Sequence, residues 1–388
     1  MIPLKYNIRS LLVRRTTTLA AAGGIALVVF VWSSADMLAH GVKKTLSSSG
    51  RSDQAIVMRK GSDAELNSGV DEPNVGLILA QPGVKKDDKG APIGAGEIVV
   101  VITADKIGEV GFANVPIRGL GERSLLLRPD LKIVSGRLPR PGTDEAIVGA
   151  RLKHRFKGFE DGGVVELRKN RLLKVVGFFE DAGSSYESEV WGDIDMVRSA
   201  FGREGIVSSV RVRLESAEKL DAFRAGVEGD KSLGFQALGE KVYYEKQSEN
   251  VSLFVNALGK TVAVIAALGA SLGAMITMYA SIANRTREIG TLRALGFSRT
   301  SILTAFLIES TFLAALGGAI GALASLSMSS VRFSMVNFAT FSEVVFSFEP
   351  TPGIIGSAVL FACVLGVLGG LLPAWRAART SPVQAMRG

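Results

Sequence analysis

The triplet Gly259-Lys260-Thr261 is the first candidate for chemistry, because it resembles the end of a phosphate-binding loop. Such a loop needs glycine at both ends of G-x-x-x-x-G-K-[ST], so that backbone N–H groups can surround the phosphates. Phe254 stands where the first glycine belongs, and the triplet lies at one end of a long apolar segment. We therefore expect no nucleotide site here, and we interpret Lys260 as a side chain that reaches from a membrane helix to the interface.

Metal and nucleophilic chemistry find equally little support. The two histidines, His40 and His154, lie far apart in the chain, which disfavours a shared metal site. The sequence shows no nucleophile elbow, which is a G-x-S-x-G turn between a strand and a helix; Gly269–Gly273 has the pattern but lies inside an apolar segment. The sequence predicts a non-catalytic chain without cofactor-binding or metal-binding residues.

Glu309 is the one acidic residue deep within an apolar segment. A carboxylate in a membrane span is costly, so such a residue usually faces the interior of a helix bundle or a partner and serves a function. The alternative is a packing role, in which the carboxyl group bonds to nearby hydroxyls such as those of Ser310 or Thr304. Both interpretations remain open at this point.

The most specific signal is the segment Arg287–Gly296, which reads REIGTLRALG. Its apolar residues recur at helical spacing, and its last glycine suits the position just after a helix end. We expect a short amphipathic helix parallel to the membrane, which contacts whatever partner drives the protein. The expected contact residues are Arg287, Glu288, Ile289, Gly290, Leu292, Arg293, Leu295 and Gly296.

These residues lie among four apolar segments of a chain of 388 residues, 47% of them hydrophobic. The segments lie near Thr18–Trp32, Thr261–Ala283, Ser301–Met328 and Gly353–Leu372. Thr261–Ala283 has no charged residue, and at 1.5 Å per residue it is long enough to cross a hydrocarbon core of about 30 Å. The sequence therefore predicts a membrane protein with four spans.

The formal charge of +8 does not indicate nucleic-acid binding, because residues 42–252 hold 32 basic and 32 acidic side chains. The excess flanks the apolar segments. Eleven basic residues and one acidic residue, Glu288, lie before the first span, between the second and third, and after the fourth. By the positive-inside rule these segments and both termini are expected in the cytoplasm, and the domain over 40–255 outside it.

The domain over 40–255 contains short runs rich in Val and Ile, bounded by Gly, Asp or Pro, which predict strands at Ala55–Met58, Glu97–Thr103, Ala146–Val148, Val164–Leu167 and Leu172–Phe179. Helical patterns are fewer, the clearest being Asp193–Phe201 and Ala217–Gly226, so an α+β fold is expected. Lys241–Asn256 contains no Gly or Pro, so one helix could run from this domain through the second span as a stalk; a short connector helix is the alternative. The single cysteine, Cys363, permits no intrachain disulfide.

At the amino terminus, Pro3–Thr17 places leucine and isoleucine on one helical face and basic residues largely off it, as in an interfacial helix. A secretory signal is the alternative for the first 40 residues, although Asp36 does not suit a cleavage region.

The turn resembles the FtsX/MacB-like permease family of ABC transporters, whose second and third membrane helices are joined by a segment much like R-E-I-G-x-L-R-A-L-G. The tail from Pro373 to Arg387 is similar to the family's ending, P-A-x-x-A-A-x-x-x-P-x-x-A-L-R, with Met386 in place of the usual leucine. The stretches 135–149 and 176–180 are similar, less specifically, to the MacB-like periplasmic core.

This resemblance implies an inner-membrane permease that forms a dimer with a second copy or a paralogue, with two ATPase subunits docked on the cytoplasmic turns. ATP and Mg²⁺ are then expected on a separate ATPase polypeptide, and no cofactor on this chain, which shows no nucleotide-binding motif. A periplasmic adaptor and an outer-membrane channel are further possible partners, besides membrane lipid. The leading hypothesis is export or extraction of a lipoprotein, lipid, peptide or drug. The alternative is an FtsX-like regulator that activates a cell-wall enzyme and transports nothing.

The expected fold is four transmembrane α-helices with an α+β extracytoplasmic domain inserted between helices 1 and 2. In residue numbers, we expect an interfacial helix at 1–17, membrane helices at 18–39, 256–283, 301–328 and 353–372, an outer domain with its stalk at 40–255, a coupling turn at 284–300, a short outer loop at 329–352 and a cytoplasmic tail at 373–388.

Overall fold

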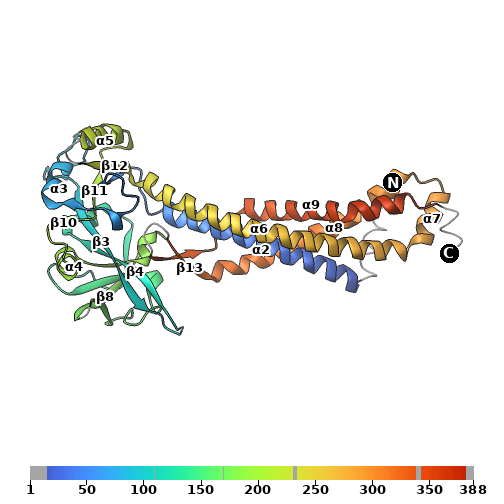
Figure 1. Cartoon of the computed structure of the whole chain (residues 1–388), viewed down its shortest axis with the longest axis horizontal. Coiled ribbons are helices and arrows are strands. Elements are labelled where there is room, and N and C mark those ends of the chain that lie inside the picture. Colours follow the sequence, from blue (N-terminus) through green and yellow to red (C-terminus); the bar gives the residue numbers. More distant parts are fainter. Residues whose placement is uncertain (1–14, 109, 169, 230–233, 338–341, 382–388) are drawn as a thin grey trace. The chain divides into compact units, whose positions relative to one another are not determined.

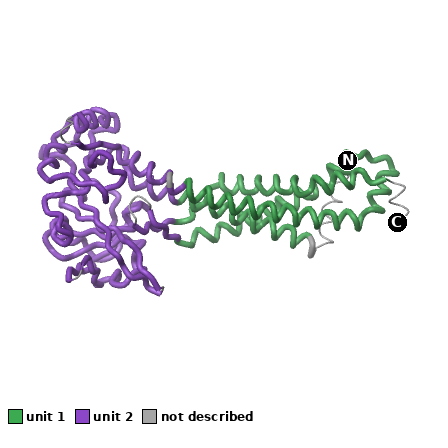
Figure 2. Tube along the Cα trace, viewed as in Figure 1, with its two compact units in different colours: residues 1–41, 253–332, 347–388 green, residues 42–252, 333–346 purple. Residues whose placement is uncertain are grey.

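The computed structural model (Figure 1) describes residues 15–108, 110–168, 170–229, 234–337 and 342–381. The chain divides into two compact units (Figure 2). The first, which we call the membrane unit, comprises Met1–Gly41, Leu253–Arg332 and Ser347–Gly388. The second, the sheet domain, comprises Val42–Ser252 and Phe333–Phe346. Most of the expected interfacial helix and the end of the tail lie outside the described residues.

Four of the described helices are long and apolar enough to cross a membrane, which confirms the predicted number of spans. They are α2 (Arg15–Ser47), α6 (Glu240–Ala283), α8 (Arg299–Ser325) and α9 (Pro352–Ala378). Helix α6 has 44 residues without a break, so it is about 66 Å long. The uninterrupted stretch before the second span is therefore the beginning of the same helix and not a separate connector.

Small residues allow α2, α8 and α9 to approach one another closely. A methyl group added at Gly318 of α8 would lie 2.4 Å from the Cβ of Ala362 in α9. Similarly, a methyl group at Gly321 would lie 2.2 Å from the carbonyl oxygen of Ala26 in α2. Both glycines are buried, so their role is to bring helix backbones together.

Helix α9 does not end at Leu372, where the sequence placed the end of the fourth span. It continues through Pro373, which is buried, as far as Ala378. Proline removes one backbone N–H from the helix, but membrane helices tolerate it where neighbouring groups compensate for the lost bond.

The sheet domain is built on a ten-stranded sheet with the order β12-β1-β11-β3-β4-β9-β6-β8-β5, in which β7 also pairs with β8. Most pairs are antiparallel, but β4 with β9 and β6 with β8 are parallel. The strands are β1 (Gln54–Arg59), β3 (Gly94–Asp105), β4 (Phe112–Leu120), β5 (Leu131–Gly136), β6 (Glu145–Gly149), β7 (Val164–Arg168), β8 (Arg171–Asp181), β9 (Val190–Asp193), β11 (Ser209–Arg213) and β12 (Phe235–Gly239).

Smaller elements complete this domain, and the expected α+β class is confirmed. Strands β2 (Val70–Asp71) and β10 (Ile206–Val207) form a separate pair. The helices are α3 (Glu72–Leu79), α4 (Ile194–Phe201) and α5 (Leu220–Gly229), with short 3₁₀ turns that include η1 (Glu65–Asn67) and η2 (Glu122–Leu127).

Two apolar cores lie along the sheet. One contains Ile98 and Val100 of β3 with Val115 and Ile117 of β4. The other contains Val210 and Val212 of β11, with Phe223 of α5. Side chains alternate between the two faces of a strand, so the residues between these positions point away from the cores. That opposite face is also buried, and it carries charged residues.

The segment between α8 and α9 is not the plain loop that the sequence predicted. It contains β13 (Arg332–Val336) and β14 (Glu343–Ser347), which pair with each other. The described residues of 333–346 pack as part of the sheet domain, although 80 residues separate them from the rest of it in the sequence. The two strands have only five residues each, which is too short for an alternating pattern to be recognised in the sequence.

We predict that Gly366→Ala lowers the thermal stability of the membrane unit, because the new Cβ would lie 2.5 Å from the Cβ of Ala314 and 2.9 Å from the carbonyl oxygen of Ser310. Gly356→Ala in the same helix is the matched control, since no atom lies within 4 Å of its Cβ position. Alanine there should be neutral or stabilising by up to about 1 kcal/mol. Melting midpoints of the two purified variants in detergent test this, and equal midpoints would refute the close-packing role.

Candidate functional site

Seven charged side chains are buried together on the face of the sheet opposite its apolar cores. We call them the ion cluster: Arg118, Arg128, Arg211, Glu65, Glu97, Glu189 and Glu240. Glu97, Arg118 and Arg211 lie on β3, β4 and β11, at strand positions that alternate with core residues. The others come from η1, the end of η2, the residue before β9 and the first residue of α6.

Arg118 lies at the centre of the ion cluster. Its guanidinium donates to both carboxylate oxygens of Glu65, at 2.9 and 3.0 Å, and to both of Glu189, at 2.8 and 2.9 Å. It also donates to Glu97 at 3.1 Å. The planar guanidinium thus holds three carboxylates, which a lysine ammonium could not do with the same geometry.

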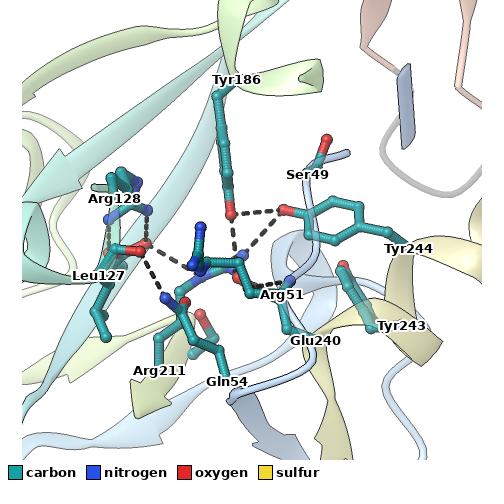
Figure 3. Close-up of polar contacts among 12 residues, drawn as sticks. Ser49, Arg51, Gln54, Leu127, Arg128, Tyr186, Arg211, Glu240, Tyr243 and Tyr244 are labelled. Atoms are coloured by element: carbon teal, nitrogen blue, oxygen red, sulfur yellow. Dashed lines mark hydrogen bonds and ion pairs between the residues drawn. The ribbon is translucent and has the colours of Figure 1, made fainter. Parts of the chain in front are cut away.

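Arg128 and Arg211 extend the ion cluster on either side. Arg128 donates two bonds of 2.7 Å to Glu97 and one of 2.8 Å to the carbonyl oxygen of Ser124. Arg211 donates to Glu65 at 2.9 Å and also to Glu240. Figure 3 shows Arg211 between Glu240 and the hydroxyl ends of Tyr186 and Tyr244.

The ion cluster fixes the first turn of α6. Glu240, the first residue of this helix, receives bonds from Arg211, from the hydroxyl of Tyr186 and, at 3.1 Å, from the backbone N–H of Arg51. Tyr244 donates to Tyr186 at 2.9 Å, and the hydroxyl of Tyr243 accepts from the N–H of Glu65 at 3.3 Å. The start of α6 is therefore bonded to the rest of the sheet domain through three of its own side chains, and Figure 3 shows the bonds of two of them, Glu240 and Tyr244.

The arginines keep Glu65 and Glu97 ionised, whereas burial outweighs Arg211 at Glu240 and raises the pKa of that carboxyl group. Burial alone would raise the pKa of Glu65, but the guanidinium groups of Arg118 and Arg211 outweigh burial and lower it. Burial opposes ionisation of Glu97 as well, and Arg128 with Arg118 and Arg211 brings its pKa below the ordinary value. Such a buried group is costly to disturb, because loss of one partner leaves an uncompensated charge.

Two further contacts fasten chain segments next to membrane helices to the sheet domain. Arg151 donates to the carbonyl oxygen of Val345 in β14 at 2.5 Å, to Glu187 at 3.0 Å and to the hydroxyl of Thr45, near the end of α2, at 3.4 Å. Glu343 of β14 pairs with Arg155 at 2.7 Å and with Lys106 at 3.4 Å. Segments adjoining α2, α6, α8 and α9 are thus all bonded within one domain.

In the membrane unit, the predicted amphipathic turn is α7 (Thr286–Ala294). Gly296 follows the helix end with φ of +94°, and the N–H of Phe297 donates to the carbonyl oxygen of Leu292 at 3.2 Å. This pattern is the helix-ending motif that requires glycine, as the sequence predicted for Gly296. Arg293 donates from its guanidinium to the carbonyl oxygen of Phe297 and closes the same turn.

Part of the apolar face of α7 packs against the chain itself, and the expected contact with a partner stays a prediction. Ile289 is only 2% exposed and packs with Met278, Ile282, Ile302, Phe306 and three alanines of α9. Gly290 is buried too, and Leu292 lies half-buried beside the same group. Leu295, in contrast, is 73% exposed, and Arg287 and Glu288 are exposed on the helix.

Glu309 is paired with Arg285, the residue just before α7. The Arg285 guanidinium lies 3.1 Å from one Glu309 oxygen, and both side chains are only 6% exposed. Ser310 and Thr304, the expected hydroxyl partners, donate instead to carbonyl oxygens of their own helix. The packing interpretation named the wrong partners. A buried ion pair joins α7 to α8, and Arg285 also contacts Glu288 at 3.1 Å.

The triplet Gly259-Lys260-Thr261 lies within α6, so its backbone is helical and does not form a phosphate loop. A methyl group at Gly259 would lie 2.3 Å from the Cβ of Ala35, so this glycine lets α2 and α6 approach. The ammonium of Lys260 lies 3.9 Å from Asp36 and 5.7 Å from the ring centre of Trp32.

Neither the ion cluster nor the Arg285–Glu309 pair was predicted from the sequence. Single charges inside otherwise apolar strands, such as Glu97 in GAGEIVVV and Arg211 in SVRVR, were the available signal for the cluster. For the pair, the signal was symmetry about the turn, because Arg285 and Glu309 are equally distant from Phe297 in the sequence. Antiparallel helices bring such positions together.

We predict that Arg128→Met destabilises the sheet domain by about 3–5 kcal/mol, because Glu97 loses its two-bond partner inside the protein. Lys157→Met, the matched control, removes a cation whose pair with Asp105 is largely exposed and should change stability little. Denaturant unfolding of the full chain in detergent, followed by Trp191 fluorescence with Trp32 and Trp375 replaced by Phe, measures both. Equal midpoints for the two variants would contradict a structural role of the cluster.

Two family models match the chain. Residues 16–229 match the MacB-like periplasmic core domain, and residues 260–382 match the FtsX-like permease C-terminal region. The first match alone covers more than half of the 388 residues. The two matches correspond closely to the sheet domain with α2 and to the remaining membrane helices.

Curated relatives agree with this result. An ABC transporter permease of Bacillus subtilis (strain 168), YknZ, is 30% identical over 210 residues, which are 52% of this chain and 49% of that protein. The macrolide export ATP-binding/permease protein MacB of Burkholderia pseudomallei (strain 1710b) is 28% identical over 293 residues, 70% of this chain and 43% of MacB. A permease of Methanocaldococcus jannaschii is 27% identical over 237 residues, 58% of this chain and 57% of that protein.

The chain therefore spans about half the length of these relatives. The described fold fits the same assignment, with four apolar helices and a mixed α/β domain whose sequence lies mainly between the first two of them. This chain belongs to the MacB-like and FtsX-like permeases of ABC transporters.

Proposed function

We propose that this permease converts ATP hydrolysis on a separate ABC ATPase into movement of the sheet domain, and that this movement exports or extracts a lipoprotein, lipid, peptide or drug. The observation that carries the proposal is that α6 is fixed at both ends. Glu240 at its start is bonded into the ion cluster, and Met278 and Ile282 near its end pack against Ile289 of α7. A continuous helix held in this way transmits displacement along its axis.

The ATPase would bind the exposed face of α7. Arg287, Glu288 and Leu295 are exposed there, whereas Ile289 is committed to the membrane unit. This face offers one apolar anchor surrounded by charges, which suits a helix that docks into a groove. ATP and Mg²⁺ would be bound by the ATPase and not by this chain.

Movement of α7 would reach the other helices through the contacts beneath it. Ile289 shares one apolar cluster with residues of α6, α8 and α9, and Arg285 is paired with Glu309 of α8. A displacement of α7 therefore acts on three long helices together. The segments that adjoin these helices are bonded to the sheet domain through Glu240, Val345 and Glu343.

The orientation that serves this mechanism places α7 and both termini in the cytoplasm and the sheet domain on the opposite side. The eleven-to-one excess of basic residues around the spans supports it. Two permease chains, two ATPases and, in a bacterium with two membranes, an adaptor and an outer-membrane channel would complete the assembly.

Cysteine labelling tests the orientation. We expect Ala217→Cys in the sheet domain to react with a membrane-impermeant maleimide in intact cells, and Ala294→Cys in α7 to react only after lysis. Both alanines are exposed, and a Cys363→Ser background removes the one native thiol. Reaction of Ala294→Cys in intact cells without reaction of Ala217→Cys would reverse the topology.

A second test concerns the ATPase contact. Leu295→Asp should weaken co-purification of the ATPase about tenfold or more, because burial of a leucine contributes about 1.5–3 kcal/mol. Leu77→Asp, at a leucine of the sheet domain that is 53% exposed, is the matched control and should leave binding unchanged. Arg287→Ala should weaken ATPase binding less than Leu295→Asp does, and its effect should be larger at low salt than at high salt.

The readouts are co-purification and ATPase rate at matched expression of both variants. If Leu295→Asp binds and stimulates the ATPase as the wild type does, α7 is not the coupling element. Leu292→Asp is a poor test, because this side chain packs within the membrane unit and its replacement would disturb the fold.

A further inference from the structure

A cavity of about 290 Å³ opens in the sheet domain, at the end of β4 and apart from the ion cluster's charged groups. Its walls come from the residues after β4, from the loop at 138–141, and from β6 and β9. They are largely apolar and include Leu120, Leu125, Leu138, Ile147 and two prolines, Pro139 and Pro141. A pocket of this size, with apolar walls and few polar groups, is of the kind that binds small ligands.

The loop that forms one wall is held in place without a ligand. Arg137 donates to Glu145 at 2.7 Å, and the backbone N–H of Arg140 donates to the same carboxylate at 3.0 Å. These bonds lower the pKa of Glu145 to about 2, so Glu145 is ionised at physiological pH and keeps its bonds to Arg137 and Arg140. On the far side of the loop, the N–H of Gly142 donates to Asp193 at 3.0 Å. The pocket is therefore preformed, which lowers the entropic cost of binding.

The charges that line the pocket are two carboxylates, Glu122 and Asp193, against one guanidinium, Arg140. Asp193 is already engaged, since it accepts from Gly142 and from the N–H groups of Asp195 and Met196 at the start of α4. Glu122 is exposed and, within the described part of the chain, receives no hydrogen bond and forms no ion pair. The pocket thus has apolar walls and a net negative charge at its opening, where the carboxylate of Glu122 is available to a ligand.

We propose that this pocket binds an organic cation in which a positive charge is attached to an apolar group. The apolar group fills the space between Leu120, Leu125 and Leu138, and the cation lies at the rim near Glu122. Two kinds of molecule carry this chemistry: a small amphiphilic amine, and a basic residue next to an apolar one in an extended peptide. Because binding needs neither the ATPase nor transport, this inference stands or falls separately from the proposed function.

The test uses the full chain in phosphatidylcholine nanodiscs, with empty nanodiscs as the blank, and fluorine NMR of two probes. 5-Fluorotryptamine and 5-fluoroindole-3-acetate share one apolar ring and carry opposite charges. We expect the amine to bind about fivefold more tightly than the acid, which is the upper end of what one exposed ion pair supports. Equal affinities, tighter binding of the acid, or no binding of the amine would overturn the proposal.

Variants locate the site. Leu125→Trp should fill the pocket and abolish amine binding, whereas Leu126→Trp, at the neighbouring residue that is 48% exposed and does not line the pocket, should not. Glu122→Gln should remove most of the preference for the amine, and Glu218→Gln, at an exposed acid elsewhere, should keep it. If Leu125→Trp fails to fold, the comparison of Glu122→Gln with Glu218→Gln still tests whether the amine binds in this pocket.

A third probe distinguishes the two sources of the ligand. N-acetyl-5-fluorotryptophanyl-lysine amide presents the same ring and charge on a peptide backbone. Tighter binding of this dipeptide than of the amine assigns the pocket to peptides, and weaker binding assigns it to small amines. Loss of the difference between Leu125→Trp and Leu126→Trp with every probe would mean that the ligands bind elsewhere, and the proposal would be wrong.

Discussion

The burial of three guanidinium groups against four carboxylates is the interaction on which the arrangement of the sheet domain depends. Each of these groups would be strongly disfavoured in the interior by itself, so each is retained only while its partners stay in place. The members come from β3, β4, β11, two 3₁₀ turns, the residue before β9 and the start of α6. The cluster therefore specifies how these segments meet, where apolar contacts alone would tolerate sliding.

This constraint reaches the membrane helices because Glu240 belongs both to the cluster and to α6. Charged hydrogen bonds are directional, so the first turn of the helix cannot rotate or shift without breaking bonds to Arg211 and Tyr186. At the other end of the same helix the fastening is of a different kind, with apolar packing against Ile289 and a single buried pair, Arg285–Glu309, beside it. Packing permits small sliding movements between helices, so in the proposed function α7 is the moving part and the cluster the fixed one.

The ion cluster and the pocket below β4 differ in what their charges can do. In the cluster, carboxylates and guanidinium groups satisfy one another, and the pKa values of Glu65 and Glu97 stay low, so little capacity remains for a ligand. In the pocket, Glu122 has no partner among the described residues, and apolar walls surround an open volume. Buried and mutually paired charges serve the fold, whereas an uncommitted charge beside an apolar cavity is suited to recognition.

The four spans, the α+β class and the helix-ending role of Gly296 could be predicted from the sequence, because hydropathy, strand composition and glycine geometry are local properties of the chain. Five of the ten main strands were recognised in the same way, whereas β4, β5, β9, β11 and β12 were not, since proline, glycine, charge or short length interrupts their patterns. The ATPase-contact role of the turn residues was a further prediction, and it stays one.

Other features were decided only by the tertiary structure. The direction of the apolar face of α7 depends on which helices lie beneath it, and the sequence alone did not show that Ile289 packs against α6, α8 and α9. Arg118 brings together Glu65, Glu97 and Glu189 from positions up to 124 residues apart in the chain. The described residues of 333–346 belong to the sheet domain, although the rest of that domain lies between Val42 and Ser252. Amphipathic periodicity reports that a residue is buried but not against what, because the identity of the neighbour is set by long-range packing.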